Sequence, residues 1–182
     1  MTEETKLGKT ARPLADSLKK QSDKLLESLK KVLSAQEEIG KELTLSLKDA
    51  IPAITAFQMV HVASLMGGNN YLGEAQINEF NGVFTQVLYG FPDEKLVGYL
   101  QQYEKNKALA LSEQLVRFSE DVVIALTGSA AGVVYGTPLA IMAKEFYLRN
   151  VGLVAEHFGD KETTDACIKA IKEIHNSAGP NS

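Results

Sequence analysis

A row of apolar residues that recurs every seven positions in the N-terminal part of the chain constrains the fold most strongly. The row consists of Leu18, Leu25, Val32 and Ile39, and a neighbouring row contains Leu29 and Leu43. This spacing places the side chains on one face of an α-helix, as in a coiled coil. The other positions are mainly Lys, Glu, Gln and Ser. The pattern therefore predicts a long amphipathic helix over residues 13–50.

Two roles are compatible with the apolar face of this predicted helix. The face can pack against the rest of the same chain, or it can form a coiled coil with a protein partner or a second copy. In the second case the partner-binding residues are Leu18, Leu25, Leu29, Val32, Ile39 and Leu43. We favour internal packing and keep partner binding or self-association as the alternative. Membrane-surface binding is disfavoured, because the polar face is not predominantly basic.

The remaining sequence, residues 51–176, predicts a helical body. Apolar residues recur at steps of three and four, and no segment alternates apolar and polar residues as a half-buried strand does. Residues that are typical of helix ends predict where further helices begin. The predicted starts lie near Pro52, Gly73, Pro92, Leu111, Pro138 and Asp160. We predict an all-α fold, a compact bundle of about six or seven helices, with flexible ends at residues 1–12 and 177–182.

The charge and cysteine content narrow the range of functions. The 182 residues carry a net charge of −4, whereas a nucleic-acid-binding domain usually presents a basic surface. Cys167 is the only cysteine, so an internal disulfide is excluded, which fits a reducing compartment. The N-terminal residues contain no apolar core of a signal peptide. We expect a cytoplasmic protein that does not bind nucleic acid.

The segment SLMGGNNYLGEAQINEF, residues 64–80, joins two predicted helices through a bend rich in Gly and Asn. An apolar helix, a short polar bend and a second helix that carries a glutamate resemble the repeats of TerB-like (tellurite-resistance-type) helical domains. The resemblance covers residues 52–160, with a second, looser repeat at 125–159. It implies a helical interaction domain with a role in a bacterial stress response.

The TerB-like resemblance also implies a site for a divalent metal such as calcium in this bend. The implied ligands are Asn69, Asn70, Glu74 and Glu79. Asparagine stands where the family has aspartate, and a smaller number of carboxylates lowers the affinity for calcium. We therefore favour a turn that the glycines permit, keep the metal site as the alternative, and expect no other cofactor.

No residue pattern indicates an enzyme class. The sequence lacks the H-E-x-x-H motif and the paired cysteines that bind zinc. His61 lies in an apolar helix and is expected to be a core histidine, and Cys167 is expected to be an inert buried thiol. An acid–base pair of His61 and Glu79 stays open as the enzymatic alternative.

The uncharged segment 122–143 is the main argument for a membrane protein. Three glycines, from Gly128 to Gly136, follow one another at steps of four, which permits close helix packing in a bilayer. Glycine also disfavours helix in water, so we predict a loop or a tight helix crossing over Gly128–Pro138. We expect a non-enzymatic helical interaction or scaffold module. The alternative is a membrane-associating helical protein that uses segments 50–66 and 122–143.

Overall fold

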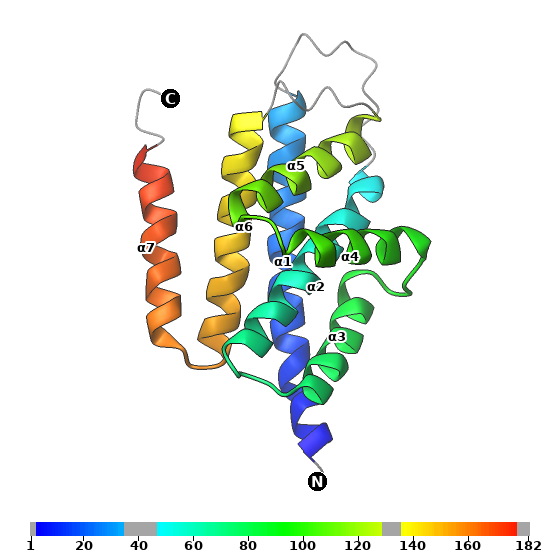
Figure 1. The fold of residues 1–182 in the computed structure, drawn as a ribbon, viewed down its shortest axis with the longest axis vertical. Helices are drawn as coiled ribbons and strands as arrows, with labels where there is room; N and C mark the ends of the chain where they lie inside the picture. Colours follow the sequence, from blue (N-terminus) through cyan, green and yellow to red (C-terminus); the bar gives the residue numbers. More distant parts are fainter. Residues whose placement is uncertain (1–2, 35–46, 129–135, 178–182) are drawn as a thin grey trace.

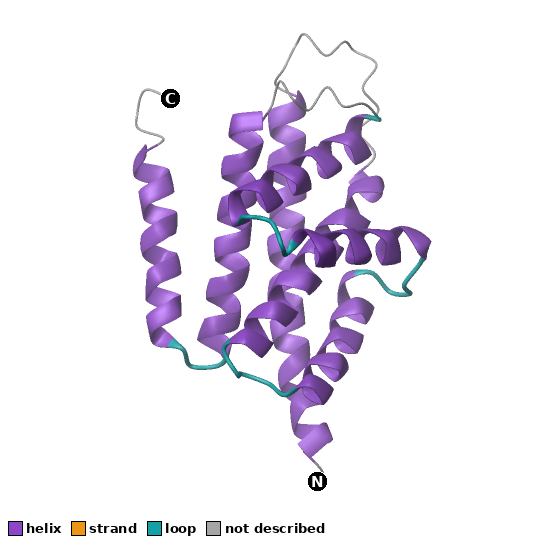
Figure 2. Cartoon of the chain, in the orientation of Figure 1, coloured by secondary structure: helices purple, strands orange, loops and turns teal. Residues whose placement is uncertain are grey.

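The computed structural model describes residues 3–34, 47–128 and 136–177, and it confirms the predicted all-α class (Figure 2). The described ranges contain seven helices and no strand. The helices are α1 (Glu3–Ser34), α2 (Leu47–Gly68), α3 (Glu74–Leu88), α4 (Glu94–Asn106), α5 (Leu111–Thr127), α6 (Gly136–His157) and α7 (Lys161–Ser177).

Three helices that are far apart in the sequence form one layer. The helices α1, α6 and α7 run side by side along the long axis of the molecule, with α6 between the other two (Figure 1). The helices α2, α3 and α5 pack against this layer, while α4 packs against α2 and crosses the long axis. The helix α7 lies at the edge and packs against α6.

The helix α2 is the centre of the core. Nearly every residue from Pro52 to Val60 is buried, as expected for a helix that is apolar on all sides. Two clusters of buried side chains meet on it. One surrounds Phe57, whose ring stacks on that of Phe118 at a centroid distance of 4.0 Å. The other contains Phe80 and Phe84 from α3 together with residues of α1.

The apolar face of α1 packs into this core. Leu18, Leu25 and Leu29 are all less than 10% exposed and belong to the two clusters. Internal packing is therefore the role of this part of the predicted row. Val32, in the last turn that the structure describes, is half-buried. Ile39 and Leu43 lie outside the described residues.

The helix α1 begins earlier than the sequence predicts. Residues 1–12 were expected to be flexible, yet α1 starts at Glu3 and contains Pro13 in its interior. Proline removes one backbone hydrogen bond from a helix. The helix nevertheless extends to the N-terminal side of Pro13, because Ala11 and Leu14 are buried in the second cluster. The predicted end at residue 50 also differs, since residues 47–50 belong to α2.

The uncharged segment 122–143 is divided between two helices. The helix α5 ends at Thr127, where Gly128 adopts a left-handed conformation with φ of 71°. The next helix, α6, begins at Gly136, and residues 129–135 lie outside the described ranges. Within the part of the chain that the structure describes, only α2 is long and apolar enough to cross a membrane. About two thirds of its most apolar window (67%) is buried inside the protein.

Substitution of Gly128 tests whether the end of α5 requires the left-handed conformation of this residue. A side chain is strained at positive φ, so Gly128→Ala should lower the free energy of unfolding by about 1–2 kcal/mol. Gly98 is a matched control, because it lies in α4 with open space around it and without positive φ. Gly98→Ala should raise the free energy of unfolding by about 0.5–1 kcal/mol. Chemical denaturation measures the free energy of unfolding of both variants. Equal effects of the two substitutions would contradict the left-handed conformation of Gly128.

Candidate functional site

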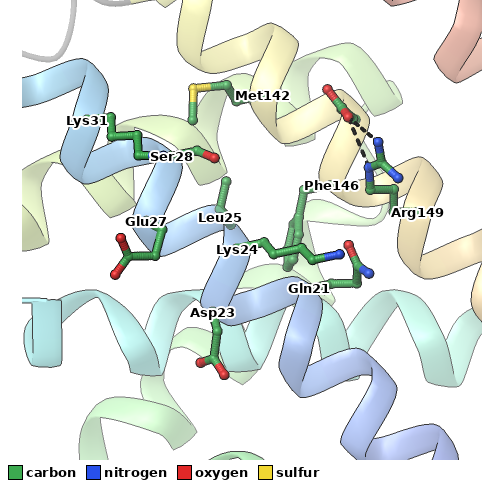
Figure 3. Close-up of a pocket in the computed structure, with 11 residues that line it drawn as sticks. Gln21, Asp23, Lys24, Leu25, Glu27, Ser28, Lys31, Met142, Phe146 and Arg149 are labelled. Carbon is green, nitrogen blue, oxygen red and sulfur yellow. Dashed lines mark hydrogen bonds and ion pairs between the residues drawn. The ribbon is translucent and has the colours of Figure 1, made fainter.

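A groove of about 510 Å³ lies between α1 and α6. We call it the α1–α6 groove. Its apolar surface comes from Leu25 on α1 and from Met142 and Phe146 on α6 (Figure 3). Its polar lining consists of Gln21, Asp23, Lys24, Glu27, Ser28, Lys31, Glu145 and Arg149. A volume of this size lies within the range of ligand-binding clefts.

Glu145 is the centre of a charged cluster beside the groove. Its Oε1 accepts hydrogen bonds from Nε (2.9 Å) and Nη2 (2.7 Å) of Arg149, and Nε2 of His175 on α7 lies 3.1 Å from the same oxygen. Burial raises the pKa of Glu145, but the hydrogen bonds from Arg149 and His175 outweigh burial and hold this pKa below its usual value. The carboxylate therefore stays ionised and already has its partners.

Two lysines of the groove have no such partner. Within the described ranges, neither Lys24 nor Lys31 forms an ion pair, whereas Asp23 pairs with Lys19 at 3.6 Å. Lys24 and Lys31 are seven residues apart, so they lie on the same face of α1. Lys24 extends from α1 toward α6 (Figure 3), and Asp23 and Glu27 line the same groove. Among the charged lining side chains that form no ion pair in the described ranges, two are lysines and Glu27 is the one acid, so the unpaired charge of the groove is positive.

The side chains of the described residues bear on the kind of ligand that the groove could bind. No group of three or more His, Cys, Asp or Glu side chains in the described ranges could hold a metal ion. Cys167 is buried and 6% exposed, and burial, followed by the nearby charge of Asp160, raises the pKa of its thiol. A buried thiol with a raised pKa is a poor nucleophile. Lysine ammonium groups above an apolar surface instead favour an acidic, amphipathic ligand.

The predicted metal ligands lie in and after the bend between α2 and α3. Asn69, Asn70 and Glu74 are exposed, and Glu79 is half-buried in α3. Asn70 adopts a left-handed conformation with φ of 54°, which asparagine tolerates in turns. These positions fit a turn, and calcium binding by the four residues stays a prediction.

A tyrosine that the sequence did not single out holds this bend in place. The Tyr71 hydroxyl donates a hydrogen bond to Asp160, at the start of α7, and the Tyr71 ring stacks on that of Phe158 at 5.0 Å. Asp160 also caps α7 by accepting a hydrogen bond from the Thr163 N–H at 3.0 Å. Residues 71 and 160 are too far apart in the sequence for this contact to be predicted. The bend is thus tied to the connection between α6 and α7.

His61 lies between aromatic rings and not beside an acid–base partner. Its ring is 4.3 Å from that of Phe57 and 5.3 Å from that of Tyr147, measured between centroids. Burial, with a smaller effect of Lys107, lowers the pKa of His61 to about 4, although Glu104 opposes this shift. No hydrogen bond connects His61 to Glu79 in the described structure. The geometry therefore does not bring together the pair that the enzymatic alternative requires.

A buried amide network crosses the core next to His61. Gln58 is fully buried, and its Nε2 donates to the Leu18 carbonyl and to Asn150 Oδ1, both at 2.9 Å. Asn150 Nδ2 in turn donates to the Phe146 carbonyl at 2.8 Å. The network joins α1, α2 and α6, and thereby fixes the two helices that form the groove. A single Gln inside an apolar helix was the only sequence feature that could have indicated it.

Stability should depend on pH through His61. Its pKa is about 4 in the folded protein and 6.5 in an ordinary histidine, so the unfolded chain takes up the proton first as the pH falls. The stabilising effect is complete above pH 6.5. Between pH 7 and pH 4, this one group should lower the free energy of unfolding by about 3 kcal/mol.

Urea denaturation of the wild type and of His61→Phe at both pH values isolates this contribution. The carboxylates titrate in both proteins, so the difference between the two pH dependences belongs to His61. Parallel pH dependences of the wild type and the variant would show that His61 is not held neutral by the fold.

Comparison with known proteins does not identify a relative. No protein-family model, no curated protein and no solved structure matches the chain. The resemblance to TerB-like domains therefore stays a prediction.

Proposed function

We propose that the protein is a non-enzymatic helical interaction module that binds an acidic amphipathic helix of a partner protein in the α1–α6 groove. The observation that carries this proposal is the pair Lys24 and Lys31, which have no ion-pair partner in the described chain and border an apolar surface. The expected cytoplasmic location and stress-response role, which rest on the sequence alone, are compatible with such a module.

The length of the groove supports a helical ligand. Its lining on α1 runs from Gln21 to Lys31, which at 1.5 Å per residue spans about 15 Å, or about three helical turns. An amphipathic helix in a groove commonly contributes apolar residues at steps of three and four. Leu25, Met142 and Phe146 would receive such residues.

The charges support an acidic ligand. Glu145 is already paired with Arg149, and Asp23 with Lys19, so these pairs add little net charge. Lys24 and Lys31 remain, and carboxylates on either side of an apolar stripe would pair with them. Such complementarity contributes specificity and a faster association rate more than affinity. Glu27 also lines the groove without an ion pair in the described ranges, and it offsets one of the two lysine charges.

A selection experiment tests this proposal without knowledge of the natural partner. A displayed library of amphipathic helical peptides, with fixed apolar positions and random polar positions, is selected on the wild-type protein and on Lys24→Glu/Lys31→Glu. The wild type should enrich peptides with acidic residues beside the apolar stripe, and the double variant should enrich basic residues there.

The matched control reverses two exposed lysines away from the groove, Lys105→Glu/Lys161→Glu. This control carries the same net charge as the groove variant and should enrich the same acidic peptides as the wild type. Acidic enrichment that survives in the groove variant, or no enrichment on the wild type, would contradict the proposal.

A further inference from the structure

A phenylalanine in the connection between α3 and α4 is almost fully exposed. Phe91 is 91% exposed, whereas the other exposed large apolar side chains of the described ranges lie between 40% and 47%. An aromatic ring of this size contributes about 150–250 Å² of surface when it is buried, so its exposure to water is unfavourable. The residues that flank Phe91, from Tyr89 to Asp93, determine whether its ring could turn toward the core.

The loop around Phe91 holds the ring away from the protein. The Tyr89 hydroxyl donates a hydrogen bond to Asp93 Oδ2 at 2.7 Å, which joins the two sides of the loop that carries Phe91. Asp93 Oδ1 accepts the Leu96 N–H at 2.9 Å and so caps α4. Gly90 has φ of 92°, which glycine adopts most readily, and its N–H donates to the Thr85 carbonyl at 2.9 Å.

The charge states of Tyr89 and Asp93 preserve this loop over the neutral pH range. Burial, followed by the bond to Asp93, raises the pKa of Tyr89 to about 12. The Leu96 N–H, followed by the Tyr89 hydroxyl, lowers the pKa of Asp93. The phenol therefore remains a donor and the carboxylate remains an acceptor. These bonds hold the backbone of the loop on both sides of Phe91, which reduces the entropy cost of binding.

A hollow of about 390 Å³ borders the loop that carries Phe91. It is lined by Lys48, Pro52, Tyr89, Asp93, Glu94 and Lys95, and Phe91 is not among these residues. Pro52 and Tyr89 give it an apolar part, while two lysines and two acids surround it. The hollow has space for an aromatic side chain that its own loop does not supply.

We propose that two copies of the chain associate across a two-fold axis, with Phe91 of each copy in the hollow of the other. A two-fold interface uses the same surface on both partners, so it requires a projection and a matching recess within one patch. Tyr89 and Asp93, which line the recess, are each two residues from Phe91. The rim also carries equal numbers of both charges, so that a lysine of one copy can face an acid of the other.

This self-association is independent of the α1–α6 groove, because the two surfaces share no residue. It also differs from the coiled coil expected from the N-terminal apolar row. Failure of one proposal therefore leaves the other unaffected.

The molar mass in solution tests the proposal. Sedimentation or light scattering of the full chain, from micromolar to millimolar concentration, should show the 19.8-kDa monomer converting to a dimer. Phe91→Ala should remain a monomer at concentrations where the wild type is a dimer. The control Ile168→Ala removes an apolar side chain on α7 that is 46% exposed, and it should behave as the wild type does. The folded state should survive both substitutions, because neither side chain belongs to the core.

A photo-crosslinking amino acid in place of Phe91 identifies where the ring binds. Cross-links between two copies should connect position 91 to the peptide that contains Lys48 and Pro52, or to Tyr89. A wild type that stays monomeric over the whole range would overturn the proposal, as would a dimer that persists in Phe91→Ala. Cross-links confined to another surface would do the same.

Discussion

Phe57→Ala should lower the free energy of unfolding by about 3–5 kcal/mol, as truncation of a buried aromatic residue usually does. Phe57 is 1% exposed. Its ring lies 4.0 Å from that of Phe118, 5.9 Å from that of Tyr103 and 6.2 Å from that of Phe146. The cavity left by the ring would be bordered by residues of α2, α4, α5 and α6, so collapse at one helix cannot fill it. Denaturation in urea measures the loss.

The exposed Phe91 provides the control for this substitution. Phe91→Ala removes the same atoms from a ring that is 91% exposed, so it should change the free energy of unfolding by no more than about 0.5 kcal/mol. The free energy of unfolding of Phe91→Ala is measured at low protein concentration, where self-association does not contribute to stability. A loss below about 1 kcal/mol in Phe57→Ala would contradict the aromatic centre of the core.

Leu18→Asp should abolish cooperative folding. Leu18 is fully buried in the second cluster, and its carbonyl accepts the Gln58 amide. A carboxylate there would be buried without a partner, which costs several kcal/mol and approaches the whole stability of a domain of this size. Circular dichroism should show lost helix content or a strongly lowered melting temperature.

The corresponding surface change separates charge from burial. Lys20→Asp introduces a carboxylate two residues further along α1, at an exposed position. It should alter the free energy of unfolding by about 0.5 kcal/mol or less. If Leu18→Asp melted as the wild type does, α1 would not be part of the core.

Local sequence patterns predicted the helices well, because helix periodicity and helix ends depend on neighbouring residues. Gly67 and Gly68 form the end of α2, as the sequence indicated, whereas α2 begins at Leu47, five residues before the predicted start at Pro52. The left-handed Gly128 ends α5 inside the uncharged segment, where a loop was predicted. The sequence placed the start of α1 too late, because burial of Ala11 extends the helix beyond Pro13.

The candidate site could not be predicted in the same way. The heptad row of α1 has the same periodicity whether its face packs inside the chain or against a partner. Only the position of α6 shows that Leu25 borders a groove while Leu18 is fully enclosed. The amide network could not be predicted either, because Gln58 and Asn150 are 92 residues apart in the sequence. Such contacts arise from tertiary packing, and local periodicity does not specify them.

The methionine methyl groups provide the most direct measurement of whether the α1–α6 groove binds an acidic helix. Of the four methionines, Met142 lines the groove, while Met59 and Met66 are buried in the second cluster. Protein labelled with ¹³C at the methionine methyls is titrated with an acidic amphipathic helical peptide and observed by NMR. We predict a saturable shift of the Met142 resonance, unchanged Met59 and Met66 resonances, and loss of the shift in Lys24→Glu/Lys31→Glu. An unchanged Met142 resonance, or an equal shift in the charge-reversed protein, would contradict the proposed binding site.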